Sequence, residues 1–240
     1  MFGGLHSVSV RIVAVAVVAV VAVAVALVAA PQALNFSLIQ SHQRPAMELL
    51  EPPPFVRHRL TVHDYHRMAQ AEVLAPGARV ELIEGEVIDM APMGTRHRAA
   101  VMRLSQLLHD AVGHAAHVST QLPLRLDAHS EPEPDLALLK PRDDFYADTL
   151  PSGADTWLVI EVSDTTLAYD TRIKAPLYAR GGVPELWVLD LAGHQLHRYA
   201  RPMGGAGPGY GEHTVLDKTS PLTLALPGLP GRTIDLSDLL

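Results

Sequence analysis

The 240-residue sequence contains no cysteine, which excludes disulfide bonds, catalysis by a thiolate and zinc sites built on sulfur ligands. Its 13 histidines include no HExxH pair, and the nearest spacing, His63 with His66, lies on an early helix where surface placement is expected. No glycine-rich stretch is followed by the Lys-Ser or Lys-Thr pair of a phosphate-binding loop. Ser152 and Ser163 lack the histidine and acid context of serine hydrolases.

The chain also lacks a basic excess. Its formal net charge is −7, and residues 1–46 carry two cations and no acid, so the remaining residues have a net charge of −9. Proteins that bind duplex nucleic acid usually present a basic face. A nucleic-acid interaction therefore has to rely on a local patch. One candidate is the cluster Arg96, His97, Arg98 and Arg103, although such a cluster at the start of a helix is more often a solvated face.

The most apolar stretch, residues 12–30, consists almost wholly of valine and alanine. It is long enough to span a bilayer and follows a single arginine. Three interpretations are open: a signal peptide, a membrane anchor, or a low-complexity extension upstream of a true start at Met47. Because domain signals begin only after Met47, we divide the sequence into an extension, residues 1–46, and a domain, residues 47–240.

Sequence periodicity predicts that this domain mixes helices and strands. Thr61 and Asp64 suit the capping box of a first helix, and Glu84-Gly85 marks the turn of a hairpin over residues 81–90. The further expected elements are an amphipathic helix at 97–112, strands at 118–126, 134–139 and 157–162, a helix at 171–180, a strand at 185–190 and its partner at 195–199. The order after the hairpin, α, β, β, β, α, β, predicts an α/β fold with a central mixed sheet flanked by helices.

Two carboxylates lie inside apolar, strand-like runs: Asp135 and Glu161. A buried carboxylate is costly unless it shifts its pKa, finds a cation or holds a metal ion. Adjacent strands lie about 4.8 Å apart, so carboxylates at matching strand ends can chelate one hard cation, Mg²⁺ or alternatively Mn²⁺. Lys174, 13 residues after Glu161, can reach the same pocket from the following helix. The other interpretation is that Lys174 forms an exposed helical pair with Asp170.

A set of short motifs is spread in a fixed order over the domain: Leu60-Thr61-Val62 with Tyr65, Glu81-Leu82-Ile83-Glu84-Gly85-Glu86, His97, Pro134-Asp135, Glu161-Val162-Ser163, Lys174-Ala175-Pro176-Leu177-Tyr178, and Gly182-Val183-Pro184-Glu185-Leu186-Trp187-Val188-Leu189-Asp190. In this order they resemble the Uma2 family, a restriction-endonuclease-like group within the PD-(D/E)XK nuclease superfamily. The resemblance covers nearly everything after Met47. It implies a nuclease-like fold with Asp135 and Glu161 as metal ligands.

The resemblance also implies one departure from the superfamily pattern. Ser163 occupies the lysine position of the ExK motif, and Lys174 on the next helix is the matching residue. A further glutamate is expected near the site, with Glu86 preferred to Glu81 by its place in the hairpin. His97 opens the helix nearest the site, where it positions a phosphate or water, or serves in packing.

The expected function is that of a magnesium-dependent endonuclease that hydrolyses nucleic acid, with DNA as the expected substrate, in the cytoplasm. A homodimer is one oligomeric state expected of an endonuclease that cleaves both strands of duplex DNA. The competing hypothesis is a catalytically inactive nuclease-like module whose charged residues are a remaining ion-pair cluster. A third is a membrane-anchored or exported protein, which requires that residues 12–30 are translated and retained.

Overall fold

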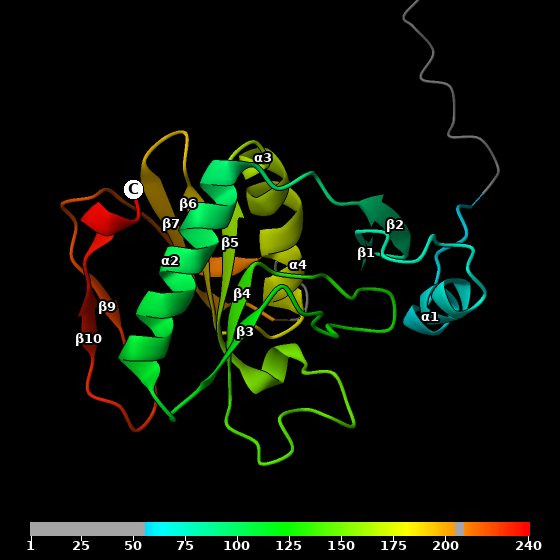
Figure 1. The fold of residues 1–240 in the computed structure, drawn as a ribbon, viewed down its shortest axis with the longest axis horizontal. Coiled ribbons are helices and arrows are strands. Elements are labelled where there is room, and N and C mark those ends of the chain that lie inside the picture. Colours follow the sequence, from blue (N-terminus) through cyan, green and yellow to red (C-terminus); the bar gives the residue numbers. More distant parts are fainter. Residues whose placement is uncertain (1–55, 205–208) are drawn as a thin grey trace, which may run out of the picture. The chain divides into compact units, whose positions relative to one another are not determined.

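A mixed sheet of six strands forms the centre of the computed structural model, which describes residues 56–204 and 209–240 (Figure 1). In spatial order the strands are β3 (His117–Thr120), β4 (Leu136–Leu139), β5 (Thr156–Ser163), β6 (Glu185–Asp190), β7 (Gln195–Pro202) and β8 (Tyr210–Leu216). Neighbours are antiparallel except β5 and β6, which are parallel. The expected mixed α/β fold class is confirmed.

The apolar extension and the expected start at Met47 lie outside the described residues. Within residues 56–204 and 209–240, no helix combines the length and the apolar composition that crossing a membrane requires.

The parallel pair β5 and β6 needs a crossover, because parallel strands cannot be joined by a tight turn. This crossover is a helical segment composed of α3 (Leu167–Tyr169), a π-helical turn η2 (Asp170–Lys174) and α4 (Ala175–Arg180). It begins earlier than the helix expected at 171–180. Pro176 lies in the first turn of α4. A proline lacks the N–H that a continuous α-helix would use there, and the wider turn of η2 changes the hydrogen-bond pattern just before it.

Helices cover both faces of the sheet. The buried side of α2 (Thr95–Val112) includes the predicted apolar stripe and packs on one face. The C-terminal segment packs into the same core and runs beside α2 in Figure 1; it contains β9 (Leu222–Leu224), β10 (Arg232–Ile234) and the short 3₁₀ helix η3 (Leu236–Asp238). Helix α4 packs on the opposite face through Ala175 and Tyr178.

The interior strand β5 is divided between the two cores. Leu158, Ile160 and Val162 contribute to the core under α2, whereas Val159 contributes to the core under α4. Side chains alternate along a strand, so Glu161 shares the face of Val159. The sequence therefore directs this carboxylate toward the crossover helix and away from α2.

The segment before α2 begins with α1 (Val62–Gln70) and a hairpin of β1 (Val80–Ile83) and β2 (Glu86–Asp89). The capping box is present: the Thr61 hydroxyl accepts a hydrogen bond from the Asp64 backbone N–H, and the Asp64 carboxylate accepts one from the Thr61 N–H. Glu84 and Gly85 form the hairpin turn with φ of 50° and 83°. Two consecutive positive φ angles are typical of the two-residue turn that matches strand twist.

The strand expected at 118–126 is shorter than predicted. It ends at Thr120, which pairs with Leu136 of β4. Gln121 then adopts a φ of 51°, a left-handed conformation that interrupts an extended strand. The chain continues to β4 without regular structure.

Replacing Gly85 by Ala should lower the free energy of unfolding more than the same change at Gly77. Both glycines have positive φ, 83° and 75°, which an alanine adopts at a cost of about 1–2 kcal/mol. A Cβ at Gly85 would also lie 2.6 Å from Arg59 Cβ, whereas one at Gly77 meets no atom within 4 Å. Urea unfolding should give a loss of about 1 kcal/mol for Gly77→Ala and at least twice that for Gly85→Ala. If both variants lost the same free energy of unfolding, the close approach of Arg59 to Gly85 would make no contribution to stability.

Candidate active site

The strand register places the two carboxylates opposite each other. Leu136 of β4 pairs with Ile160 of β5 in antiparallel orientation. Asp135 precedes Leu136 and Glu161 follows Ile160, so Asp135 and Glu161 lie opposite each other. The strands are antiparallel, which brings the start of β4 and the end of β5 to one edge of the sheet. Both residues are buried, with 9% of Asp135 and 4% of Glu161 exposed.

Asp135 is held by two elements. Its Oδ2 accepts a hydrogen bond of 2.8 Å from the backbone N–H of Val162 and one of 3.0 Å from Nε2 of His97. His97 lies in the first turn of α2, and its hydrogen bond to Asp135 raises the pKa of the imidazole, although burial acts in the opposite direction. His97 thus contacts the aspartate and positions it. Nδ1 of His97 is buried and has no hydrogen-bond partner among the described residues.

Glu161 belongs to a buried cluster around Lys174. Lys174 Nζ donates to Glu161 Oε1 at 3.1 Å and lies 3.0 Å from Glu81 Oε2. The hydroxyl of Tyr178 donates to the same Glu161 oxygen at 2.6 Å. All four side chains are buried. The cluster therefore ties together the hairpin strand β1, the central strand β5 and the crossover helix.

The crossover orients Lys174 inward. Asp170 and Lys174 are the first and last residues of η2, and both are buried. Asp170 Oδ2 accepts hydrogen bonds from the hydroxyls of Ser163 and Thr166 at 2.6 and 2.5 Å. The two residues do not form the exposed helical pair that was the alternative interpretation of Lys174. Ser163, at the ExK lysine position, instead anchors the start of the turn that carries the lysine.

The cluster holds more carboxylates than cations. Burial raises the pKa of Glu161 to about 8, an effect that Lys174 opposes and the neighbouring acids Asp170 and Asp135 reinforce. Burial also raises the pKa of Asp170, against the hydrogen bonds from its two hydroxyl partners. Burial alone would lower the pKa of Lys174, but Glu161 and Glu81 outweigh it and raise the pKa. Lys174 therefore stays protonated, and Glu161 retains a proton near neutral pH unless another cation approaches.

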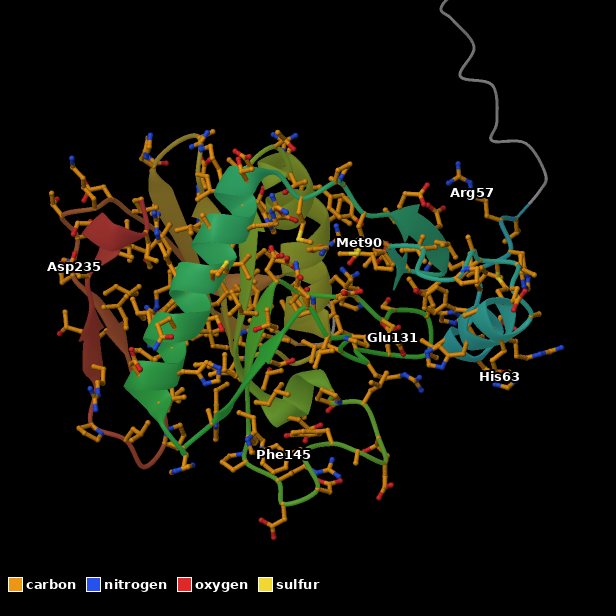
Figure 2. The ribbon with its side chains drawn as sticks, viewed as in Figure 1. Arg57, His63, Met90, Glu131, Phe145 and Asp235 are labelled. Carbon is orange, nitrogen blue, oxygen red and sulfur yellow. The ribbon has the colours of Figure 1, made fainter. Side chains whose placement is uncertain are left out.

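These residues share one pocket of about 440 Å³. Glu81, Asp135, Glu161 and Lys174 all line it. The segment that joins β2 to α2, residues 90–94, forms part of its wall, and Figure 2 labels Met90 on this segment. The pocket thus opens at the edge of the sheet where the two carboxylates meet.

The hairpin contributes Glu81, and not Glu86, to the site. Glu86 directly follows the turn, has a side chain that is 56% exposed, and pairs with Arg57. Glu81 pairs across the hairpin with Ile88, farther from the turn, and its side chain is 3% exposed. The sequence preference for Glu86 is therefore corrected. The difference arises because Glu86, beside the turn, meets Arg57, whereas Glu81, at the other end of the hairpin, meets Lys174.

Sequence reasoning missed Tyr178 and Asp170 as neighbours of the site. They lie four residues after and four before Lys174, and helical spacing alone places such residues on one face. The spacing that groups Asp170, Lys174 and Tyr178 was therefore visible in the sequence. The sequence did not show that this face of the helix is buried against the sheet.

The donor set suits a hard divalent cation. Asp135 Oδ1 accepts only a long 3.5 Å bond from Gln121, and Glu161 Oε2 has no hydrogen-bond partner among the described residues. Each carboxylate thus keeps one oxygen for a ligand. Within the described part of the chain, no group of three or more histidine and acidic side chains is arranged around a common metal position. Two carboxylates are still sufficient for Mg²⁺, which usually keeps several waters.

The fold is that of a nuclease-like protein. A solved structure, described as a "putative nuclease belonging to DUF820" from Anabaena variabilis, matches with a TM-score of 0.57 and 16% sequence identity, over 75% of this chain and 97% of that chain. The Uma2 family, described as "Putative restriction endonuclease", matches residues 62–237. The chain belongs to the Uma2 family, as the resemblance implied. No functionally curated protein matches it.

Glu161→Gln should stabilise the metal-free protein increasingly as the pH rises. The folded pKa of Glu161, about 8, lies above its ordinary value of 4.5, so the folded state holds a proton that the unfolded state has lost. The free energy of unfolding therefore falls as the pH rises between these values. Glutamine removes this loss while keeping an oxygen for Lys174 and Tyr178.

Thermal unfolding at about pH 5 and about pH 8.5, with a chelator present, measures this difference, since each kcal/mol shifts Tm by roughly 2–4 °C in a domain of this size. The exposed Glu212→Gln serves as the control and should give the same small difference at both pH values. A Tm difference between Glu161→Gln and the wild type that stays constant or shrinks with pH contradicts the raised pKa.

Proposed function

We propose that the protein is a metal-dependent endonuclease that hydrolyses phosphodiester bonds, with Mg²⁺ as the metal and DNA as the substrate. The observation that carries the proposal is the meeting of Asp135, Glu161 and Lys174 at one pocket, on the edge of a nuclease-like sheet. Two oxygen ligands and a lysine are the groups that phosphodiester hydrolysis needs, because negative charge develops on the phosphate.

The carboxylates hold the metal in this proposal. The free oxygens of Asp135 and Glu161 would bind the cation, and the backbone N–H of Val162 and the imidazole of His97 keep the aspartate in place. When bound, a divalent cation supplies an activated water and offsets charge on the leaving oxygen. His97 is thus a positioning residue, since it acts through Asp135.

Lys174 supplies the fixed positive charge. Its raised pKa keeps it protonated, and its contacts with Glu161 and Glu81 fix its position before substrate arrives. A preorganised charge costs no reorganisation during the reaction, which is why such groups stabilise transition states more than mobile ones. Glu81 orients the lysine and adds negative charge that favours a divalent cation in the pocket.

Asp135→Asn and Glu161→Gln should each abolish cleavage of supercoiled plasmid DNA in the presence of Mg²⁺ or Mn²⁺. Each change removes a charge that the metal needs, while the amide oxygen still accepts the hydrogen bonds from Val162 and His97 at position 135 and from Lys174 and Tyr178 at position 161. Gel electrophoresis of nicked and linear products measures the rate, with single-stranded DNA and RNA tested in parallel. The matched controls, Asp148→Asn in the loop before β5 and Glu212→Gln on β8, change exposed acids and should cleave like the wild type. Full activity in both site variants would exclude these residues as the catalytic centre.

One observation favours the competing function, a catalytically inactive binding module. Lys174 already neutralises part of the acidic cluster, because it lies within 3.1 Å of oxygens on both Glu161 and Glu81. If this neutralisation were sufficient, the pocket would have no use for a metal ion. The excess of carboxylates and the raised pKa of Glu161 support metal binding instead.

Calorimetric titration separates the two functions. We expect Mg²⁺ or Mn²⁺ to bind with one site per chain, and the affinity to rise with pH up to about 8, because the ion must displace the proton of Glu161. Asp135→Asn should weaken this binding at least tenfold, whereas Asp148→Asn should not change it. Absence of binding to the wild-type protein at pH 8 would favour the inactive module.

A further inference from the structure

The cations of α2 are divided between its two flanks. The helix carries Arg96, Arg98 and Arg103 but a single acid, Asp110, in a chain whose net charge is −7. At 3.6 residues per turn, Arg103 lies within about 20° of Arg96, whereas Arg98 lies about 160° away from it on the other side of the helix. The cluster that looked uniform in the sequence is therefore two separate surfaces.

A groove follows the flank of Arg96 and Arg103. It consists of two adjoining hollows of about 380 and 810 Å³, which share Arg103, Ser237 and Leu239 as lining residues. One wall is α2, and the other is formed by β10 and η3. Figure 2 labels Asp235 on this C-terminal wall. The groove thus runs along the helix between α2 and the C-terminal segment.

The groove begins where the active-site pocket ends. Gly94 and His97 line the pocket, and the residues between them, Thr95 and Arg96, line the first hollow. Nη1 of Arg96 lies 3.5 Å from an oxygen of Asp164, which is itself a pocket residue. The first turn of α2 therefore borders both spaces.

The near end of the groove is cationic. Arg96 and Arg103 are the charged side chains among the described residues that line the first hollow. Arg103 and Arg232 form no ion pair with any residue that the structure describes. Asp110 and Asp235 line the second hollow together with Arg103 and Arg232, so the second hollow is mixed in charge and the cationic excess lies at the near end.

The arginine in the first turn also works against helix stability. Positive charge near a helix N-terminus is unfavourable, and the first turn of α2 contains no acid and no capping side chain; Asp164, 3.5 Å from Nη1 of Arg96, offsets part of this cost from outside the helix. Arg96 also donates a hydrogen bond of 2.7 Å to the carbonyl oxygen of Leu191, so it has a structural role at this end of the groove. Arg103 and Arg232 have no ion-pair partner among the described residues, and theirs are the positive charges that the groove offers to a ligand.

We propose that this groove, with Arg96, Arg103 and Arg232 on its walls, binds the phosphate backbone of duplex DNA on one side of the bond that is cut. Seven residues of helix span about 10.5 Å. The two arginines of α2 can therefore contact different phosphates of one DNA strand. The inference rests on the proposed function, because it takes the pocket as the place of cleavage.

The test is the salt dependence of binding to a fluorescently labelled duplex DNA, measured by anisotropy with Ca²⁺ in place of Mg²⁺. Arg103→Gln should weaken binding about three- to tenfold at roughly 0.1 M salt and reduce the slope of log K against log salt by about 0.9, the value for one lost phosphate contact. Arg232→Gln, on the opposite wall, should act in the same direction. Arg103→Lys should restore the slope.

Arg98→Gln is the matched control, since it removes the same charge from the same helix on the other flank and should leave the slope unchanged. Equal losses for Arg98→Gln and Arg103→Gln would overturn the groove, as would an unchanged slope for Arg103→Gln, or no binding of duplex DNA by the wild type. Thermal unfolding of each variant confirms that it is folded. Labelled single-stranded DNA and RNA of the same sequence should bind less tightly than the duplex, and tighter binding of either contradicts the proposed ligand.

Cleavage is scored separately from binding, so the two proposals can fail independently. One outcome is that the wild type binds duplex DNA, that Arg103→Gln reduces the salt dependence of this binding, and that the wild type cleaves no DNA. This outcome supports DNA binding in the groove and contradicts the proposed function. A protein that cuts plasmid DNA while Arg103→Gln binds like the wild type supports the function and overturns the groove.

Discussion

The buried contact of Lys174 with Glu161 and Glu81 is the interaction on which the rest of the site depends. It joins a strand of the outer hairpin, the central parallel strand and the crossover between parallel strands. The hairpin strand lies far in sequence from β5 and from the crossover that follows β5, so the charge cluster exists only when the sheet, the hairpin and the crossover are all in place. An ion pair this buried is weak support for stability in itself, because the cost of desolvation offsets much of the attraction. Its value lies in fixing one arrangement of three elements around a polar pocket.

The central part of the fold was predictable from sequence because local signals and tertiary packing agree there. The run around Glu161 is apolar on both sides, as an interior strand requires, and residues 185–190 were assigned within the bounds that the structure shows. The capping box at Thr61 and the hairpin turn at Gly85 are likewise local features with a single reading. The predicted strand after α2 was longer than the observed one, because the residue types there do not indicate the left-handed conformation of Gln121.

The site was predictable where strand alternation decides it and unpredictable where a long-range contact does. Alternation places Glu161 on the face of Val159 and Asp135 on the face of Ala137, and the register that pairs Leu136 with Ile160 makes these the same face. Glu81 and Glu86 are equivalent in local pattern, and only their partners in the folded chain, Lys174 for Glu81 and Arg57 for Glu86, separate them. Similarly, helical spacing links Asp170, Lys174 and Tyr178, but only the packing of α4 against the sheet shows that this face is buried.

The serine at position 163 affects how nuclease-like sites of this kind can be recognised in a sequence. At the position where a lysine is expected, this serine donates a hydrogen bond to Asp170 and so secures the helix from which Lys174 extends. The positive charge has moved along the chain by eleven positions while still meeting the end of the strand. A search for the ExK motif on one strand fails to detect this chain. A search for a lysine side chain beside two carboxylates at a sheet edge detects it. What defines the site in this chain is the position of a cation in space, and the chain reaches that position from the helix after the strand.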